Sequence, residues 1–218
     1  METSDRGRNF FIVTIIICIF NLLIFGLNYF FPKDYYLLGG MNYEKVVVQG
    51  EYSRFLTCMY LHGDVAHIGM NLIAIAAAGS LVESYLGSLK MIVIYLLSGL
   101  GGSILSLVVH SGDHQVYSIG ASGAAFGLLV ASAIIQNKKQ GRSMVQAILF
   151  VCFYAVATWS EGIDLTGHMG GAVLGAVATL ILSRNFREDD LESLPKKIVG
   201  CIVGILVSLA AVWCIYGG

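Results

Sequence analysis

Charged residues are scarce in this 218-residue chain. Asp, Glu, Lys and Arg make up 12% of it, whereas soluble domains carry about 25%, so we expect a lipid bilayer to be its main solvent. Proline is almost missing, with two residues against 26 glycines, which favours packed helices over a turn-rich β fold. The net charge is −1 and no basic stripe is interleaved with aromatic residues, so nucleic acid is not an expected partner.

Patterns typical of disulfide and metal sites are lacking as well. The five cysteines are odd in number and contain no CxxC pair, which argues against a disulfide framework and a zinc site. The HExxH signature of metalloproteases does not occur. His110 and His114 are four residues apart, but the SGD between them is typical of a loop. We expect neither a metal nor a cofactor.

Long apolar runs are what the chain does contain. A helix needs about 20 apolar residues to cross the hydrocarbon layer, and several segments meet or approach this length. They are residues 10–31, 63–82, 91–110, 119–137, 143–160, 165–183 and 197–216. The sequence therefore predicts an all-α, polytopic membrane helix bundle. We expect a single domain over 1–218, with six core transmembrane helices and one further C-terminal helix.

The placement of Lys and Arg predicts how the bundle is oriented. With a cytoplasmic N-terminus, ten basic residues lie on the inner side and three on the outer side. The inner ones are Arg6, Arg8, Lys90, Lys138, Lys139, Arg142, Arg184, Arg187, Lys196 and Lys197. The outer ones are Lys33, Lys45 and Arg54. Residues 1–9 are then a cytoplasmic tail, 32–62 an outer loop at the membrane interface, and 184–197 a charged inner linker. A short chain without a transit peptide favours a bacterial inner membrane.

Polar residues gather at the predicted outer ends of three spans. The second span carries His67 and Asn71 on one helix face, the fourth begins with Ser122 in IGASGAAFG, and the sixth carries His168 in DLTGHMGG. Because all three spans run inward from the outer side, these side chains are expected at one depth. A serine hydroxyl, a titratable imidazole and hydrogen-bond donors are the groups that acyl transfer requires.

The chemistry of these residue types suggests a role for each. A histidine can take the serine proton and later protonate the leaving amine. The backbone N–H of Ser122 at a helix start, the Asn71 amide and the His67 ring can stabilise an oxyanion. Glycines around Ser122 allow a substrate backbone to approach.

Purely structural explanations compete with this interpretation. Ser122 is followed by a GxxxG pair, Gly123 and Gly127, that is typical of close helix contacts. A lone histidine or asparagine in a membrane helix is often a structural hydrogen-bonding group. Asp164 lies four residues before His168 and suggests a third triad member, but solvated acids are ordinary in an outer loop. The joint occurrence of the polar residues at one depth favours a catalytic site.

The motifs together resemble those of the rhomboid family of intramembrane serine proteases, over nearly the whole chain from Tyr52 onward. They are GxSG (Gly120, Ala121, Ser122 and Gly123), a second-span pattern (His62, His67 and Asn71) and HxGGxxxG (His168, Gly171 and Gly175). The ESYLGS stretch, with Glu83 and Gly87, resembles the inner turn of the family after the second span. We expect Glu83 to cap or pair near the inner surface.

The resemblance implies a catalytic dyad without a third acid. Ser122 would be the nucleophile and His168 the general base, with an oxyanion hole from the Ser122 N–H, His67 and Asn71. Phe126 stands where the family has an aromatic residue that packs on the catalytic imidazole. The residues implied to support the site are Phe126, Gly120, Gly123, His62, Gly171 and Gly175.

Two other family features are implied with less complete matches. Arg54 matches the arginine of a Trp-Arg motif in the first loop, but Ser53 replaces the tryptophan, so the anchoring of that loop departs from the family pattern. The loop at 160–166 would cap a water-filled site, with the fifth span as a lateral gate.

We therefore expect hydrolysis of a peptide bond in or near the transmembrane segment of another membrane protein. The expected partners are transmembrane substrates and the lipid bilayer. One alternative is a catalytically inactive rhomboid relative that binds client proteins, although both Ser122 and His168 are present. Another is a small transporter or channel lined by the polar side chains, although the inner halves of the fourth and sixth spans are apolar.

Overall fold

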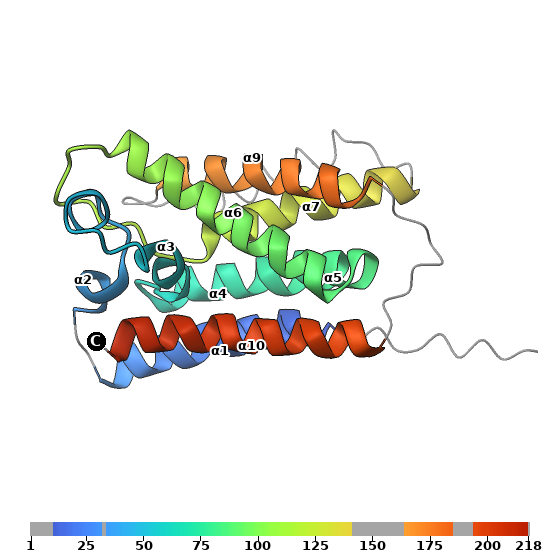
Figure 1. Cartoon of the computed structure of the whole chain (residues 1–218), viewed down its shortest axis with the longest axis horizontal. Coiled ribbons are helices and arrows are strands. Elements are labelled where there is room, and N and C mark those ends of the chain that lie inside the picture. The colour runs from blue at the N-terminus through green and yellow to red at the C-terminus, as the bar shows by residue number, and fades with distance from the viewer. Residues whose placement is uncertain (1–10, 32–33, 141–163, 185–193, 218) are drawn as a thin grey trace, which may run out of the picture.

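The computed structural model describes residues 11–31, 34–140, 164–184 and 194–217, which are folded mainly as helices (Figure 1). The long ones are α1 (Ile12–Phe30), α6 (Ser88–Val109), α7 (Ser122–Gln140), α9 (Leu165–Leu182) and α10 (Leu194–Tyr216). Another long stretch joins α4 (Val65–Ala74), the π-helical turn η3 (Ile75–Gly79) and α5 (Ser80–Leu86). The short helices are α2 (Tyr35–Gly39), η1 (Glu44–Val48), α3 (Arg54–Thr57) and η2 (Cys58–Tyr60).

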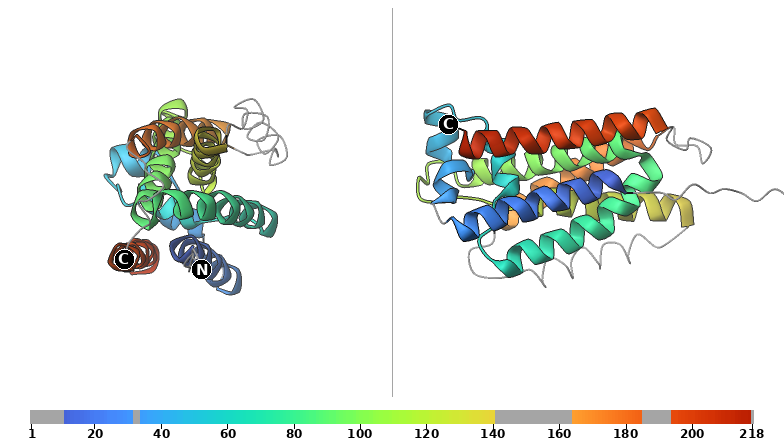
Figure 2. Two further views of the ribbon diagram at one scale, coloured as in Figure 1. Left: turned by 90° about the vertical axis from the view of Figure 1, so that its right-hand side faces the viewer. Right: turned by 90° about the horizontal axis from the view of Figure 1, so that it is seen from below.

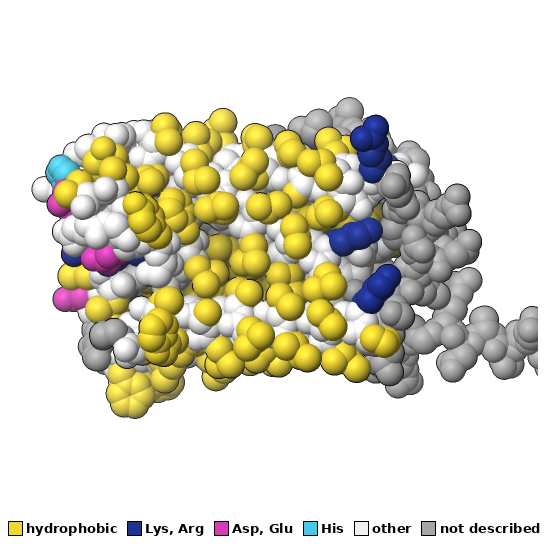
Figure 3. Space-filling model, in the orientation of Figure 1, with side chains coloured by type: hydrophobic (Ala, Val, Ile, Leu, Met, Phe, Trp, Pro, Cys, Tyr) yellow, Lys and Arg dark blue, Asp and Glu magenta, His cyan; other side chains and the backbone are white. Residues whose placement is uncertain are grey.

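Five of these helical stretches are long and apolar enough to cross a membrane, namely α1, α4–α5, α6, α9 and most of α10. Helix α7 has 19 residues but a polar end, NKKQ. Apolar side chains cover the face seen in Figure 3, with prominent basic residues at one end and acidic residues, histidine and a little basic surface at the other. The predicted all-α polytopic bundle is confirmed, and the chain is a multi-pass integral membrane protein. The predicted span 143–160 and tail 1–9 lie outside the described residues.

The first predicted connection, 32–62, contains the four short helices α2, η1, α3 and η2. They lie together at one end of the bundle (Figure 1), which we call the loop end. Helices α1 and α10 run side by side along one flank, as the two views of Figure 2 show. Helices α6, α7 and α9 form a second group of mutually packed helices.

Glycines let the backbones of α6 and α9 approach closely. A Cβ atom on Gly101 would lie 2.6 Å from the carbonyl oxygen of Gly170. One on Gly102 would lie 2.6 Å from the carbonyl oxygen of Gly167. At these two positions no side chain larger than hydrogen fits, as is typical of close helix pairs in membranes.

Glycines also allow the backbones of α7 and α9 to pack closely. A Cβ atom on Gly171 would collide with the carbonyl oxygen of Gly123. One on Gly175 would lie 2.5 Å from the Cα of Gly127. The GxxxG pair after Ser122 thus has the packing role that its spacing indicates. This packing brings the start of α7 against the first turns of α9.

Glu83 fastens the start of α1 to the turn between α5 and α6. Its buried carboxylate accepts hydrogen bonds from the backbone N–H groups of Val13 (3.0 Å) and Thr14 (2.8 Å). The hydroxyls of Thr14 (2.6 Å) and Ser88 (2.9 Å) also donate to it. These N–H groups have no partner within their own helix, so the predicted capping role of Glu83 is confirmed.

Asp164 is the N-cap of α9. Its carboxylate accepts the N–H groups of Thr166 and Gly167, both at 3.1 Å, and the hydroxyl of Ser118 at 3.0 Å. Burial by itself raises the pKa of Asp164, but hydrogen bonds from Ser106, Thr166, Gly167 and Ser118 outweigh it, and the pKa lies below its usual value. This acid holds the start of α9 beside the segment that leads into α7.

We predict that Gly175→Ala lowers the free energy of unfolding by about 1–3 kcal/mol, because the added methyl meets rigid backbone. The matched control is Gly26→Ala in α1, where a Cβ meets nothing within 4 Å. That change should be neutral or should stabilise the protein by up to about 1 kcal/mol. Unfolding followed by far-ultraviolet circular dichroism in detergent measures both, and equal losses for the two variants would contradict the prediction.

Because the pKa of Asp164 is lowered in the folded protein, the free energy of unfolding is expected to fall at acidic pH. The ionised carboxylate contributes its full stabilisation above the unfolded pKa of about 3.9, and this is lost as the pH falls through the lower folded pKa. Asp164→Asn keeps a cap oxygen but does not titrate. We expect the difference in unfolding free energy between the two proteins to be constant above about pH 5 and to shrink below about pH 4. A constant difference down to pH 3 would exclude this role.

Candidate active site

Ser122 follows a tight turn made possible by Gly120. That glycine has a φ of +123°, a conformation that residues with a side chain rarely adopt. Its N–H donates a 2.9 Å hydrogen bond to the carbonyl oxygen of Cys58. The next N–H, of the fully buried Ala121, donates to Nε2 of His62 at 3.4 Å. Backbone contacts to η2 and the residues after it therefore hold the turn that presents Ser122.

The ring of His62 is suited to accept this hydrogen bond. Burial, followed by the nearby His67, lowers the pKa of His62 to about 3, so the ring is neutral at ordinary pH. With Nε2 accepting from Ala121, the proton is on Nδ1. The family resemblance implied that His62 supports the site, and its ring contacts the serine turn itself.

His168 is buried on the first turn of α9 and stacks on Phe126. Their ring centroids are 4.2 Å apart, with an angle of 17° between the planes. Phe126 follows Ser122 by four residues on α7, so the two share a helix face. The imidazole thus lies over the face of α7 that carries the serine. No hydrogen bond joins the Ser122 hydroxyl to the ring within the described part of the chain.

Asp164 does not hold the imidazole of His168. Its carboxylate is occupied by the N–H groups of α9 and the Ser118 hydroxyl. Nδ1 of His168, the atom that a third triad member would bind, has no hydrogen-bond partner among the described residues. Within the described residues, Asp164 is therefore not placed as a third triad member.

His67 and Asn71 project from α4 toward the serine turn. A Cβ atom on Gly120 would lie 2.6 Å from Nε2 of His67 and 3.6 Å from Nδ2 of Asn71. Asp64 caps α4 by accepting the N–H of His67 at 2.8 Å, and the His62 ring packs edge-on against that of His67 with centroids 5.0 Å apart. Capping and ring packing therefore fix the position of His67 at the turn.

The Asn71 amide is buried, and its Nδ2 has no hydrogen-bond partner within the residues that the structure describes. A buried donor left unpaired costs about 1–3 kcal/mol. Such a group beside the backbone of a candidate nucleophile is available to an incoming acceptor. The structure thus places the five predicted polar site residues around the turn that leads into α7. They are Ser122, His168, His67, Asn71 and His62.

Arg54 organises the loop end from the inside. Its guanidinium is buried and donates to the carbonyl oxygens of Gly40 and Leu37, both at 2.7 Å, and to the carboxylate of Glu51 at 2.6 and 2.7 Å. The loop is therefore held by internal bonds even though Ser53 replaces the family tryptophan. No sequence pattern indicated these partners of Arg54.

The loop end also contacts the segment before Ser122 directly. Met41 and Ser118 exchange two backbone hydrogen bonds, of 2.9 and 2.8 Å. His114 pairs with Glu44 at 3.0 Å, and His110 ends α6. In the described ranges, no group of three or more His, Cys, Asp or Glu side chains is placed to hold a metal ion. The predicted cap loop and fifth span lie mostly or wholly outside these ranges.

The sequence is similar to those of known proteins. The family profile described as the Rhomboid domain matches residues 49–185. The chain is 31% identical over 185 residues to Rhomboid protease GluP of Bacillus subtilis, covering 82% of this chain and 34% of that protein. It is 33% identical to RHOMBOID-like protein 5 of Arabidopsis thaliana, covering 66% and 48%. It is 26% identical to Rhomboid protease AarA of Providencia stuartii, covering 66% and 60%.

Several of these curated relatives are longer proteins, and this chain spans about a third to a half of their length. The profile match nevertheless runs from the end of η1 through α9 and includes every candidate site residue. On the strength of that match, this chain belongs to the rhomboid family.

Proposed function

We propose that the chain is an intramembrane serine endopeptidase that cleaves transmembrane protein substrates with Ser122 and His168. The observation that carries the proposal is the stacking of the His168 ring on Phe126, over the helix face that carries Ser122. Two bacterial relatives are named as rhomboid proteases, which supports the same reaction. The plant relatives are named only as RHOMBOID-like proteins, and they keep a non-catalytic alternative open to test.

The proposed reaction begins at Ser122. Its Oγ attacks the scissile carbonyl carbon while Nε2 of His168 accepts the hydroxyl proton. The tetrahedral oxyanion receives hydrogen bonds from the Ser122 N–H, the His67 ring and Nδ2 of Asn71. As the C–N bond breaks, His168 returns its proton to the leaving amine. Water then attacks the Ser122 ester by the same base catalysis and releases the second product.

Phe126 has a defined part in this scheme. The face of an aromatic ring attracts a cation through its quadrupole. Stacked on His168, Phe126 can stabilise the imidazolium that forms when the serine proton is taken. It also fixes the ring orientation, a task that a third acid performs in triads.

The setting of the reaction is part of the proposal. The basic residues at the end opposite the loop end are expected on the cytoplasmic side, so the N-terminus is cytoplasmic and the site lies near the outer face. A bacterial inner membrane is the proposed location. A substrate helix must unwind locally to present its carbonyl, so small or helix-breaking residues are expected near the cleaved bond.

We predict that a fluorophosphonate probe labels the detergent-purified wild type, and that Ser122→Ala and His168→Ala each reduce the labelling rate by about 1000-fold or more. Matched controls are Ser132→Ala, which changes a buried serine of α7, and His114→Ala at the exposed loop end. Both controls should label like the wild type. Absent labelling of folded wild type, or full labelling of Ser122→Ala, would favour the client-binding alternative.

The oxyanion role of Asn71 is predicted separately. Asn71→Ala should slow phosphonylation of Ser122 by about 100-fold, because one preorganised donor is lost from the transition state. The control is Asn21→Ala, which removes another buried amide, on α1, and should leave the rate unchanged. Comparable rates in Asn71→Ala and the wild type would remove Asn71 from the oxyanion hole.

A further inference from the structure

Helix α10 packs into the fold through a face of small residues. Gly200, Gly204, Ser208 and Ala211 are all buried. A Cβ atom on Gly200 would lie 2.5 Å from the Cβ of Ser88 at the start of α6, and one on Gly204 would lie 3.4 Å from Val13 of α1. The α10 backbone therefore lies directly against α1 and α6.

A hydrogen bond joins this face of α10 to the loop end. The hydroxyl oxygens of Ser208 and Tyr60 are 3.2 Å apart, and both side chains are fully buried. Ser208 donates its own proton to the carbonyl oxygen of Gly204 at 2.9 Å, so Tyr60 is the donor to Ser208. Burial raises the pKa of Tyr60, which keeps that proton in place at ordinary pH.

Tyr60 lies within the segment that supports the serine turn. Two residues before it, the carbonyl oxygen of Cys58 accepts the N–H of Gly120 at 2.9 Å. Two residues after it, Nε2 of His62 accepts the N–H of Ala121 at 3.4 Å. The Tyr60 side chain is thus anchored in α10 midway between the two contacts that hold the turn.

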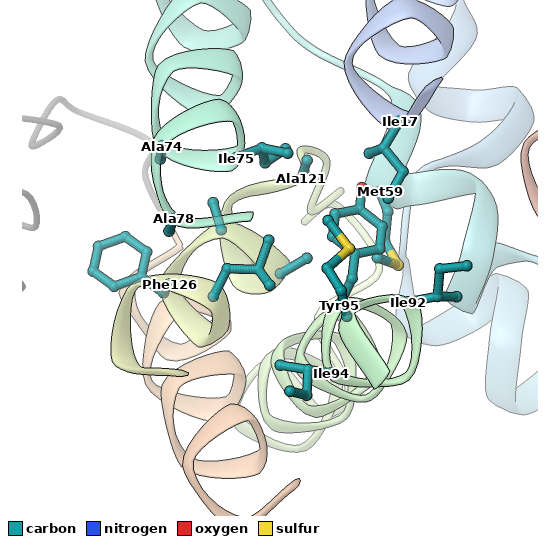
Figure 4. Close-up of a cluster of buried hydrophobic side chains, with 14 of the residues drawn as sticks. Ile17, Met59, Ala74, Ile75, Ala78, Ile92, Ile94, Tyr95, Ala121 and Phe126 are labelled. Carbon is teal, nitrogen blue, oxygen red and sulfur yellow. The ribbon is translucent and has the colours of Figure 1, made fainter. Parts of the chain in front are cut away.

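The same segment is fixed to α6 on another side. The Met59 side chain fills the space beside Gly99, and it lies with Ile17 and Tyr95 in the core (Figure 4). The Cys58 sulfur lies 3.4 Å from the Ser103 hydroxyl. Residues 58–62 therefore contact α6 on one side and α10 on the other, and these contacts hold the segment in place.

We propose that Tyr60 and Ser208 are positioning residues, which set the Gly120–Ala121 backbone, and with it Ser122, through residues 58–62. This rests on the proposed protease function. Helix α10 then acts on the reaction without touching the substrate. The positioning effect of Tyr60 comes from its hydrogen bond to Ser208. Tyr60→Phe isolates this bond, because phenylalanine fills the same space as tyrosine and lacks only the donor.

The test compares Tyr60→Phe and Ser208→Ala with Tyr216→Phe. The Tyr216 hydroxyl donates to Oδ1 of Asn28 at 2.6 Å, so its loss removes an α10 bond to α1 that involves no residue of the 58–62 segment. Fluorophosphonate labelling gives the maximal rate constant and the half-saturating probe concentration. Hydrogen exchange of the peptide over residues 117–124 reports the Gly120 and Ala121 amides without requiring activity.

We expect Tyr60→Phe and Ser208→Ala each to lower the maximal labelling rate by about three- to tenfold, with the half-saturating concentration unchanged, as loss of one buried hydrogen bond predicts. Exchange of the 117–124 amides should accelerate by a similar factor. The double variant should match the single variants, because each single change already removes the Tyr60–Ser208 bond. Tyr216→Phe should change neither quantity.

Wild-type rates and exchange in Tyr60→Phe, or equal effects in Tyr216→Phe, would overturn the positioning role. Should Tyr60→Phe not fold, Ser208→Ala decides by the same criteria. If wild type and Ser122→Ala both fail to label, the proposed function fails. The exchange comparison then still shows whether α10 holds the turn, so the two failures are distinguishable.

Discussion

The near-contact of three helix backbones is the constraint on which the rest of the structure depends. Helices α6, α7 and α9 meet through glycines that leave no room for a methyl group. In lipid, dispersion contacts and hydrogen bonds replace the hydrophobic effect as the force between helices. Close approach maximises both. It also brings the first turns of α7 and α9 together, and those turns carry Ser122 and His168.

Several buried polar atoms of the described residues have no hydrogen-bond partner. Nδ2 of Asn71 and Nδ1 of His168 have no partner in the described structure, whereas the carboxylates of Glu83 and Asp164 are each hydrogen-bonded several times. The contrast separates two uses of buried polarity. Saturated groups hold elements together, whereas the unpaired Asn71 amide beside Gly120 is a donor of the proposed oxyanion hole.

The spans and the order of the polar motifs were predictable from the sequence. Runs of about 20 apolar residues identify membrane helices with little ambiguity, and α1, α6 and α9 begin and end within a few residues of the prediction. The capping role of Glu83 was also anticipated. The roles of Ser122 and His168 remain predictions, although the structure places them on adjacent helices.

The remaining contacts could not be predicted, because they join distant segments without any periodic signal. Arg54 binds carbonyl oxygens of residues 37 and 40, and Tyr60 reaches Ser208. Asp164 was weighed as a triad member or a solvated acid, and it is the cap of α9. Each bond depends on a backbone atom or side chain brought near by the fold, and residue types do not encode that proximity.

The Glu83 carboxylate has a consequence for biosynthesis. The first N–H groups of α1 find their acceptor 69 and 70 residues later in the chain, and Ser88 completes the set. A nascent α1 inserted by itself therefore lacks this side-chain acceptor for the N–H groups at its start. Glu83 can accept them only after α5 has been synthesised, so this contact cannot form when α1 is first made.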